Sequence, residues 1–91
     1  MEEEKAVVIL KILRANGQIE QKDLEVPLTI TAYELFIGIV HAYHLAINVD
    51  DTKKSYLHAE KPIALLRGRK TLKEYNVMNG TVITIIEGLF I

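Results

Sequence analysis

Three histidines are the side chains of this sequence whose charge can change near neutral pH: His41, His44 and His58. His41 and His44 are three residues apart, so a helix could carry both imidazoles on one face and hold a metal ion between them. A structural zinc site needs about four ligands, and no sequence pattern supplies the others. We therefore expect solvated histidines and no metal site.

Two other polar groups could bind ions or perform acid–base chemistry. Asp50 and Asp51 are adjacent carboxylates in the loop-forming run 48–52, where acidic residues usually stabilise turns. The segment 67–70 (RGRK) carries three cations and could bind an acidic partner or a phosphate, or form a solvated turn. No phosphate-binding glycine pattern or nucleophile motif occurs. We expect no catalytic residue and no cofactor.

Composition narrows the class of protein. The chain has 91 residues, which predicts a single domain over 1–91, and its net charge is −1. This charge is too small to concentrate nucleic acid or anionic lipid. The apolar runs are far shorter than the roughly 20 residues of a membrane span, and the acidic start, Met1–Lys5, does not resemble an export signal. Cysteine is absent. We expect a cytoplasmic protein that neither binds nucleic acid nor inserts into a membrane.

Periodicity predicts the elements. Residues 6–14 are rich in β-forming residues and 18–26 form a second extended run after the turn 15–17, which indicates a β-hairpin after a flexible segment 1–5. Thr31, with Glu34 three residues later, forms a helix-start signal. The apolar residues that follow have helical spacing: Ala32, Leu35, Phe36, Ile39, Val40 and Tyr43. Segments 56–59 and 63–66 read as short strands, and a β-branched strand ends at Ile86.

The segment Thr71–Ile86 runs Thr71-Leu72-Lys73-Glu74-Tyr75-Asn76, then Asn79-Gly80, then the β-branched strand. This segment resembles ubiquitin. The resemblance implies a one-turn helix whose leucine and tyrosine pin the loop to the core. With the element order, it predicts an α+β, β-grasp (ubiquitin-like) fold: a mixed sheet of four to five strands on one main helix, plus a short helical turn before the last strand.

Five segments carry a resemblance to a narrower family: 8–13, 24–35, 56–57, 62–68 and 71–75. Through them, residues 6–86 taken whole resemble the bacterial YukD/EsaB-like family of small ubiquitin-like proteins associated with type VII secretion. The resemblance implies a non-catalytic accessory protein that contacts a membrane-bound secretion machinery with WXG-type substrates. It supplies no catalytic residues.

The C-terminal residues indicate whether the protein could be conjugated to another protein as ubiquitin is. After Ile86 the sequence reads Glu87-Gly88-Leu89-Phe90-Ile91, so 87–91 is expected to be an apolar tail. A ubiquitin-type modifier or sulfur carrier needs a terminal Gly-Gly, because only glycine passes the narrow channel of an activating enzyme. We therefore expect binding and not conjugation. A longer gene product that ends in Gly-Gly would favour the modifier.

An apolar surface is the sharpest functional expectation. In the fold implied by the resemblance the first and last strands are parallel neighbours, and strand alternation turns Val82, Thr84 and Ile86 outward. Ile9 and Leu13 should then lie near Thr84 and Ile86. The predicted protein-interaction residues are Ile9, Leu13, Ile86, Leu89, Phe90 and Ile91.

Alternatives for this surface remain open. The tail could fold back and cover it, or it could bind a second copy and make the protein a self-associating structural module. Glu60 stands where ubiquitin has the isoleucine at the centre of its interaction patch. The partners of ubiquitin are therefore not carried over to this chain.

Overall fold

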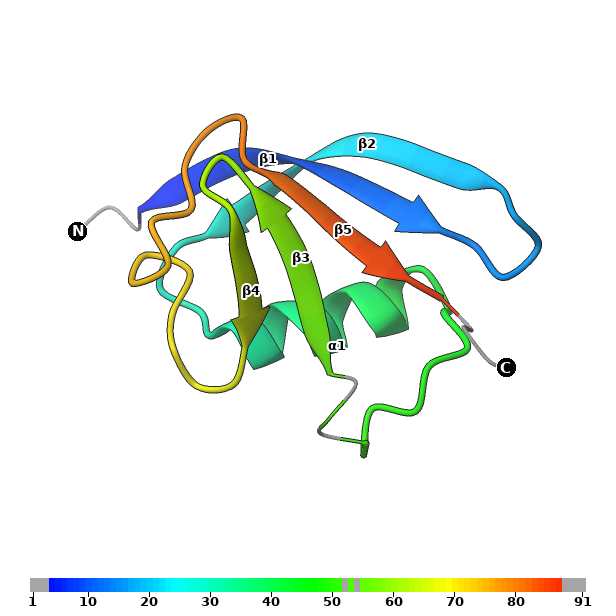
Figure 1. The fold of residues 1–91 in the computed structure, drawn as a ribbon. Coiled ribbons are helices and arrows are strands. Elements are labelled where there is room, and N and C mark those ends of the chain that lie inside the picture. The colour runs from blue at the N-terminus through cyan, green and yellow to red at the C-terminus, as the bar shows by residue number, and fades with distance from the viewer. Residues whose placement is uncertain (1–3, 52, 54, 88–91) are drawn as a thin grey trace.

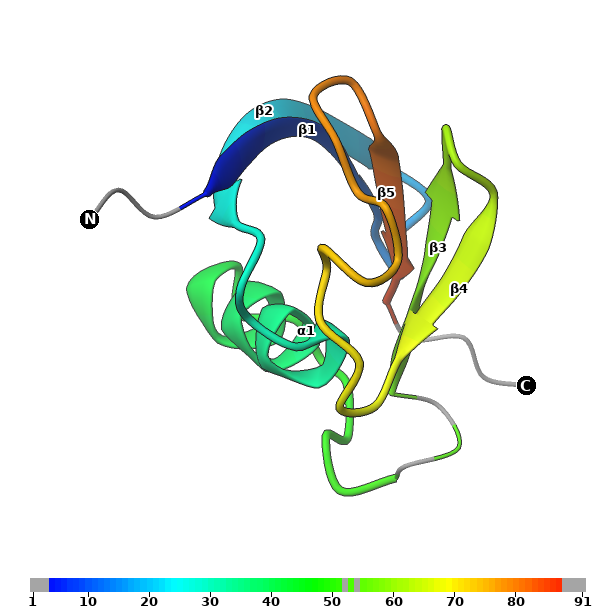
Figure 2. The ribbon, with the colours of Figure 1, turned by 90° about the vertical axis from the view of Figure 1, so that its left-hand side faces the viewer.

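A five-stranded mixed sheet packs against one helix (Figure 1). The structure is a computed structural model that describes residues 4–51, 53 and 55–87. The elements are β1 (Lys5–Leu13), β2 (Ile19–Pro27), α1 (Ala32–Ala42), β3 (Tyr56–Glu60), β4 (Ala64–Arg67) and β5 (Val82–Ile86). The strand order is β2-β1-β5-β3-β4, with β1 and β5 parallel at the centre. Figure 2 shows the sheet curving around α1. This is the predicted α+β architecture.

The β1–β2 hairpin closes with a three-residue loop. Arg14 N–H donates to the Gln18 carbonyl at 2.8 Å, and Gly17 N–H donates to the Arg14 carbonyl at 2.9 Å. Gly17 has φ +90°, the left-handed conformation that this loop type requires at its last position. Leu13 therefore pairs with Ile19.

The N-terminal boundary differs from the expectation of a flexible segment 1–5. Lys5 already belongs to β1, and the Glu4 carbonyl accepts a hydrogen bond from Leu28 N–H at 2.9 Å. The antiparallel pairing with β2 extends to this point and orders both residues. Residues 1–3 lie outside the described part of the chain.

Helix α1 begins where the sequence predicts. The Thr31 hydroxyl accepts a hydrogen bond from Glu34 N–H at 3.0 Å, and the Glu34 carboxylate accepts one from Thr31 N–H at 2.9 Å. The predicted apolar stripe faces the sheet, with five buried residues: Ala32, Leu35, Phe36, Ile39 and Val40. The helix ends at Ala42 with Tyr43 as its C-cap, so the stripe is one residue shorter than predicted and Tyr43 is only half-buried.

The Thr31→Ala variant should have a free energy of unfolding lower by about 1 kcal/mol, because the cap bond to Glu34 N–H is lost. Urea denaturation followed by circular dichroism measures this difference. Thr29→Ala, at an exposed position two residues earlier, is the control and should leave stability nearly unchanged. Equal losses in the two variants would contradict the capping role.

The core lies between α1 and the inner face of the sheet. Alternate residues of the two central strands are buried: Val8, Leu10 and Ile12 on β1, and Ile83 and Ile85 on β5. Leu57 and Leu66 extend this layer across β3 and β4. Strand β4, which the sequence predicts over 63–66, starts at Ala64 and not at Ile63, because Ile63 lies in the preceding turn and is 90% exposed.

The segment before β5 forms one helical turn, as the resemblance to ubiquitin implies. Tyr75 N–H donates to the Thr71 carbonyl at 3.1 Å, and the turn ends at Asn76 with φ +64°. Leu72 is fully buried in the core. The Tyr75 hydroxyl donates to the Arg67 carbonyl at 2.9 Å and so ties the turn to the end of β4.

Candidate interaction surface

The outer face of the sheet, on the side away from α1, carries the residues that the sequence singled out. Side chains of β1 and β5 alternate strictly between buried and half-buried over this region. Leu13 pairs with Ile86 in the parallel ladder, as predicted. Two half-buried apolar side chains of neighbouring strands therefore lie side by side on the outer face.

Ile9 lies farther from Ile86 than predicted. It pairs with Val82, and the pair Lys11–Thr84 separates it from the Leu13–Ile86 pair. The parallel register is set by Ile9 N–H, which donates to the Thr81 carbonyl at 2.9 Å, and by Gly80 N–H, which donates to the Val7 carbonyl at 2.9 Å. The outer face therefore has two apolar rows with Lys11 between them.

Sequence reasoning missed two members of this face. Ile19 pairs with Leu13 from the β2 side and is 66% exposed. Val82 was predicted to point outward but was not assigned to the surface, although it extends the row of Ile9. The register of the hairpin is the signal that would have found Ile19.

We call the five described residues of this face the outer apolar surface: Ile9, Leu13, Ile19, Val82 and Ile86. The predicted site residues Leu89, Phe90 and Ile91 lie outside the described residues.

Polar residues border the outer apolar surface. Asp23 pairs with Ile9 on one side, and Glu60 pairs with Val82 on the other. His58 pairs with Thr84 and stacks edge-on against Tyr56, with ring centroids 5.3 Å apart. The row of Ile9 and Val82 is thus bounded by carboxylates at both ends.

Glu87 holds the edge of this surface in place. It was predicted to begin an apolar tail, but its side chain is buried where three segments meet. Its carboxylate accepts hydrogen bonds from Ala15 N–H at 3.0 Å and Ala46 N–H at 2.9 Å, and lies 3.6 Å from the Arg14 guanidinium. Glu87 N–H also donates to the Leu13 carbonyl at 2.8 Å. Glu87 therefore joins the ends of β1 and β5 to the chain that leaves α1.

These contacts lower the pKa of Glu87. The largest cause is the hydrogen bond from Ala46 N–H, followed by that from Ala15 N–H, and the Arg14 charge adds to both. Burial acts in the opposite direction, because it penalises the charged carboxylate. The charged form of Glu87 is thus the form that the fold stabilises.

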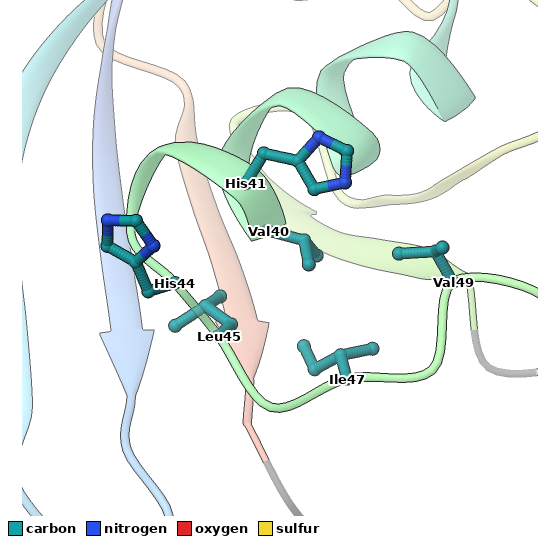
Figure 3. Close-up of a pocket in the computed structure, with 6 residues that line it drawn as sticks. All are labelled: Val40, His41, His44, Leu45, Ile47 and Val49. Atoms are coloured by element: carbon teal, nitrogen blue, oxygen red, sulfur yellow. The ribbon is translucent and has the colours of Figure 1, made fainter.

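The two histidines near the end of α1 do not converge on one point. His44 has φ +53° and lies beyond the helix, which ends at Ala42, so it does not share a helical face with His41. Figure 3 shows both rings at the rim of an open hollow, with their nitrogens pointing in different directions. Among the described residues, no group of three or more His, Asp or Glu side chains could hold a metal ion.

The remaining polar groups take local roles. Asp51 accepts a hydrogen bond from Lys53 N–H at 3.1 Å, and Asn48 accepts one from Asp50 N–H at 3.0 Å, as residues in turns do. In the 67–70 segment, the Lys70 ammonium lies 4.7 Å from the centre of the Tyr75 ring. No helix in the described part of the chain is long and apolar enough to cross a membrane.

Comparison with solved structures shows the fold. A ubiquitin from Caldiarchaeum subterraneum superposes with a TM-score of 0.62 and 21% identity, over 93% of this chain and 98% of that protein. The C-terminal ubiquitin-like domain of mouse tubulin-specific chaperone e has a TM-score of 0.57 and 18% identity, over 99% and 95%. The ubiquitin-like domain of Plasmodium falciparum Dsk2 has 0.54 and 17%, over 90% and 99%. At these identities the likeness concerns the ubiquitin-like fold alone.

The sequence comparisons are more specific about the family. No curated protein sequence matches the chain significantly. Residues 7–85, however, match the family described as "WXG100 protein secretion system (Wss), protein YukD". This match runs from within β1 through most of β5, and includes Ile9, Leu13 and Val82 of the outer apolar surface. The chain therefore belongs to the YukD family of ubiquitin-like proteins.

Proposed function

We propose that this protein is a non-catalytic accessory protein of a bacterial type VII secretion system with WXG-type substrates. It works in the cytoplasm and binds a protein component of the membrane-bound machinery through the outer apolar surface. Family membership supports the assignment to this kind of system. The observation that carries the binding role is the adjacent placement of Leu13 and Ile86 in the two central strands.

The outer apolar surface has the properties of a binding site. Its central members are half-buried and belong to the most extensively paired strands, so they are held in place before a partner arrives. Removal of apolar area from water contributes about 25 cal/mol per Å², so two rows of branched side chains supply useful association energy. Pre-ordered side chains also lose little entropy on binding.

The charges define the partner's chemistry. Lys11 lies between the two apolar rows, and Asp23 and Glu60 border the row of Ile9 and Val82. A matching partner presents apolar side chains to both rows and a carboxylate to Lys11, since a buried ammonium without a counter-charge costs binding energy. Basic groups at its margin would face the bordering carboxylates. An amphipathic helix with one acidic residue in its apolar face meets these requirements.

The test is affinity capture of the tagged protein from its native cells in mild detergent, followed by mass spectrometry. We expect enrichment of a membrane-bound secretion ATPase or of its small WXG-type substrates. The Leu13→Ser/Ile86→Ser double variant should lose this enrichment at least about tenfold, which corresponds to about 1.4 kcal/mol. Met78→Ser is the matched control, because Met78 is 52% exposed but lies outside the sheet.

Other outcomes would overturn the proposal. Recovery of an activating enzyme or of covalent adducts would favour a ubiquitin-like modifier or sulfur carrier, the main alternative. Recovery of the protein alone would favour a self-associating module. Capture that is unchanged in a folded Leu13→Ser/Ile86→Ser variant would exclude the outer apolar surface as the binding site.

A further inference from the structure

β2 is a long sheet edge that nothing in the described structure covers. It pairs with β1 alone, and its nine residues exceed the four of β4, the strand at the opposite edge. Figure 1 shows β2 along the outside of the hairpin, with no element beyond it. Such an edge is a template for pairing with another strand unless its side chains prevent it.

The hydrogen bonds at the two ends of the hairpin fix which backbone groups are available. Gln18 accepts from Arg14 N–H, and Leu28 donates to the Glu4 carbonyl, so even-numbered residues of β2 turn their backbone groups toward β1. The odd-numbered residues Ile19, Gln21, Asp23 and Glu25 turn theirs outward. Within the described chain, the backbone hydrogen bonds outside the ladders use none of these outward groups.

The charges on β2 distinguish among the ways in which two copies of this edge can pair. In an antiparallel pair related by a two-fold axis, one residue lies opposite itself. An axis at Glu20, Lys22 or Asp23 would place identical charges opposite each other. An axis at Leu24 would place Asp23 opposite Glu25. Each of these registers is therefore destabilised.

The register centred on Gln21 differs from all of these. It places Glu20 opposite Lys22 of the second copy, and does so twice because of the two-fold symmetry. Ile19 faces Asp23, and no like charges lie directly opposite. We propose that β2 pairs antiparallel with β2 of a second copy about a two-fold axis at Gln21.

The structure orders both members of this charge pair. The Glu20 carboxylate is 2.6 Å from the Arg14 Nε, and the Lys22 ammonium lies 4.7 Å from the centre of the Tyr43 ring. Both side chains are on the α1 side of the sheet, opposite to the outer apolar surface. The charges on β2 therefore disfavour the registers centred on residues 20, 22, 23 and 24, and favour the register centred on Gln21 through its two Glu20–Lys22 pairs.

The dimer goes beyond the proposed function because it would present two outer apolar surfaces in one assembly. A two-fold axis perpendicular to the sheet joins the two sheets edge to edge and leaves both outer apolar surfaces on the same side. Two copies would then engage a partner that is itself two-fold, with an avidity that one copy does not have.

Single cysteines test the register directly, because the chain has no cysteine of its own. Gln21→Cys, Lys22→Cys and Asp23→Cys are compared by the rate of oxidative cross-linking of the pure protein. Only residue 21 would face itself, at a Cα separation of about 5.5 Å that suits a disulfide, so its rate should be at least about tenfold higher. Equal rates, or a faster rate at residue 22 or 23, would overturn the proposal.

Sedimentation measures the association without cross-links. The mass should rise from 10.3 kDa toward twice that value as the protein concentration increases. Gln21→Pro removes the central outward N–H, a change that edge strands tolerate, and should keep the protein monomeric. Gln21→Ala retains the N–H and should still dimerise. A wild-type protein that stays monomeric up to millimolar concentration, or an edge that binds only an added extended peptide, would overturn the dimer.

Discussion

The Glu87→Gln variant is expected to have a free energy of unfolding about 2 kcal/mol lower than the wild type. The carboxylate accepts two backbone N–H groups, from Ala15 at 3.0 Å and Ala46 at 2.9 Å, and faces the Arg14 guanidinium. An amide of the same shape has one acceptor oxygen, so its NH₂ group would face one of these donors. Urea denaturation at pH 7 measures the difference.

The same variant should reveal the protonation of Glu87. Because the folded-state pKa is lowered, the stabilisation is fully present above the unfolded pKa of about 4.3 and is lost as pH falls through the folded value. The gap in unfolding free energy between wild type and Glu87→Gln should therefore be constant at neutral pH. It should narrow as the pH falls below about 4.

Glu25→Gln provides the control for both measurements. The Glu25 side chain is 64% exposed, and its carboxylate lies 3.9 Å from the ammonium of Lys5, whose side chain is 51% exposed. Surface pairs of this kind contribute at most about 1 kcal/mol, so this variant should stay close to the wild type. A Glu87→Gln variant as stable as Glu25→Gln would show that the contacts of Glu87 do not hold the three segments together.

The contrast between these two glutamates shows where sequence reasoning stops. The strands and the helix were predictable because their signals are local: the β-forming residues along β1, and the spacing of Thr31 and Glu34 at the start of α1. The role of Glu87 depends on backbone N–H groups 72 and 41 residues earlier in the chain. Almost any residue type can supply a backbone N–H, so the sequence does not indicate these partners. Glu87 is therefore predicted to be the first residue of an apolar tail.

The hairpin register limited the prediction of the site in a similar way. The predicted turn 15–17 left the register open, because Asn16-Gly17 most often forms a two-residue turn, which would pair residue 15 with 18 and Leu13 with Glu20. The observed loop has three residues, so Leu13 pairs with Ile19 and the apolar row extends onto β2. Strand alternation alone predicts which side chains point outward. The register is needed to know which residues of the neighbouring strand lie beside them.

The β1–β2 register also links the proposed binding surface to the proposed dimer edge. Odd-numbered residues of β2 point their side chains to the outer face and their free backbone groups to the edge. Ile19 therefore belongs to the outer apolar surface, while its N–H and carbonyl belong to the proposed dimer edge. Ile19→Ser should weaken partner binding and leave the edge hydrogen bonds intact. Gln21→Pro should remove an edge hydrogen bond and leave the affinity of a single outer apolar surface for its partner unchanged.

Two adjacent isoleucines provide the sharpest test of how the sheet divides core from surface. Ile85→Ala should lower the free energy of unfolding by about 3.5 kcal/mol, because removal of a fully buried side chain leaves a cavity in the core. Ile86→Ala removes the same atoms from a half-buried position, so its loss should be about 1 kcal/mol. Urea denaturation of both variants measures the two losses.

Partner capture should show the opposite order. Ile86→Ala should weaken capture because Ile86 and Leu13 form one row of the outer apolar surface, whereas Ile85→Ala should bind normally under conditions where it is folded. A single step along β5 thus exchanges a loss of stability for a loss of binding, as side-chain alternation requires. If Ile86→Ala costs as much stability as Ile85→Ala and leaves capture intact, Ile86 is a core residue and the outer face carries no binding site there.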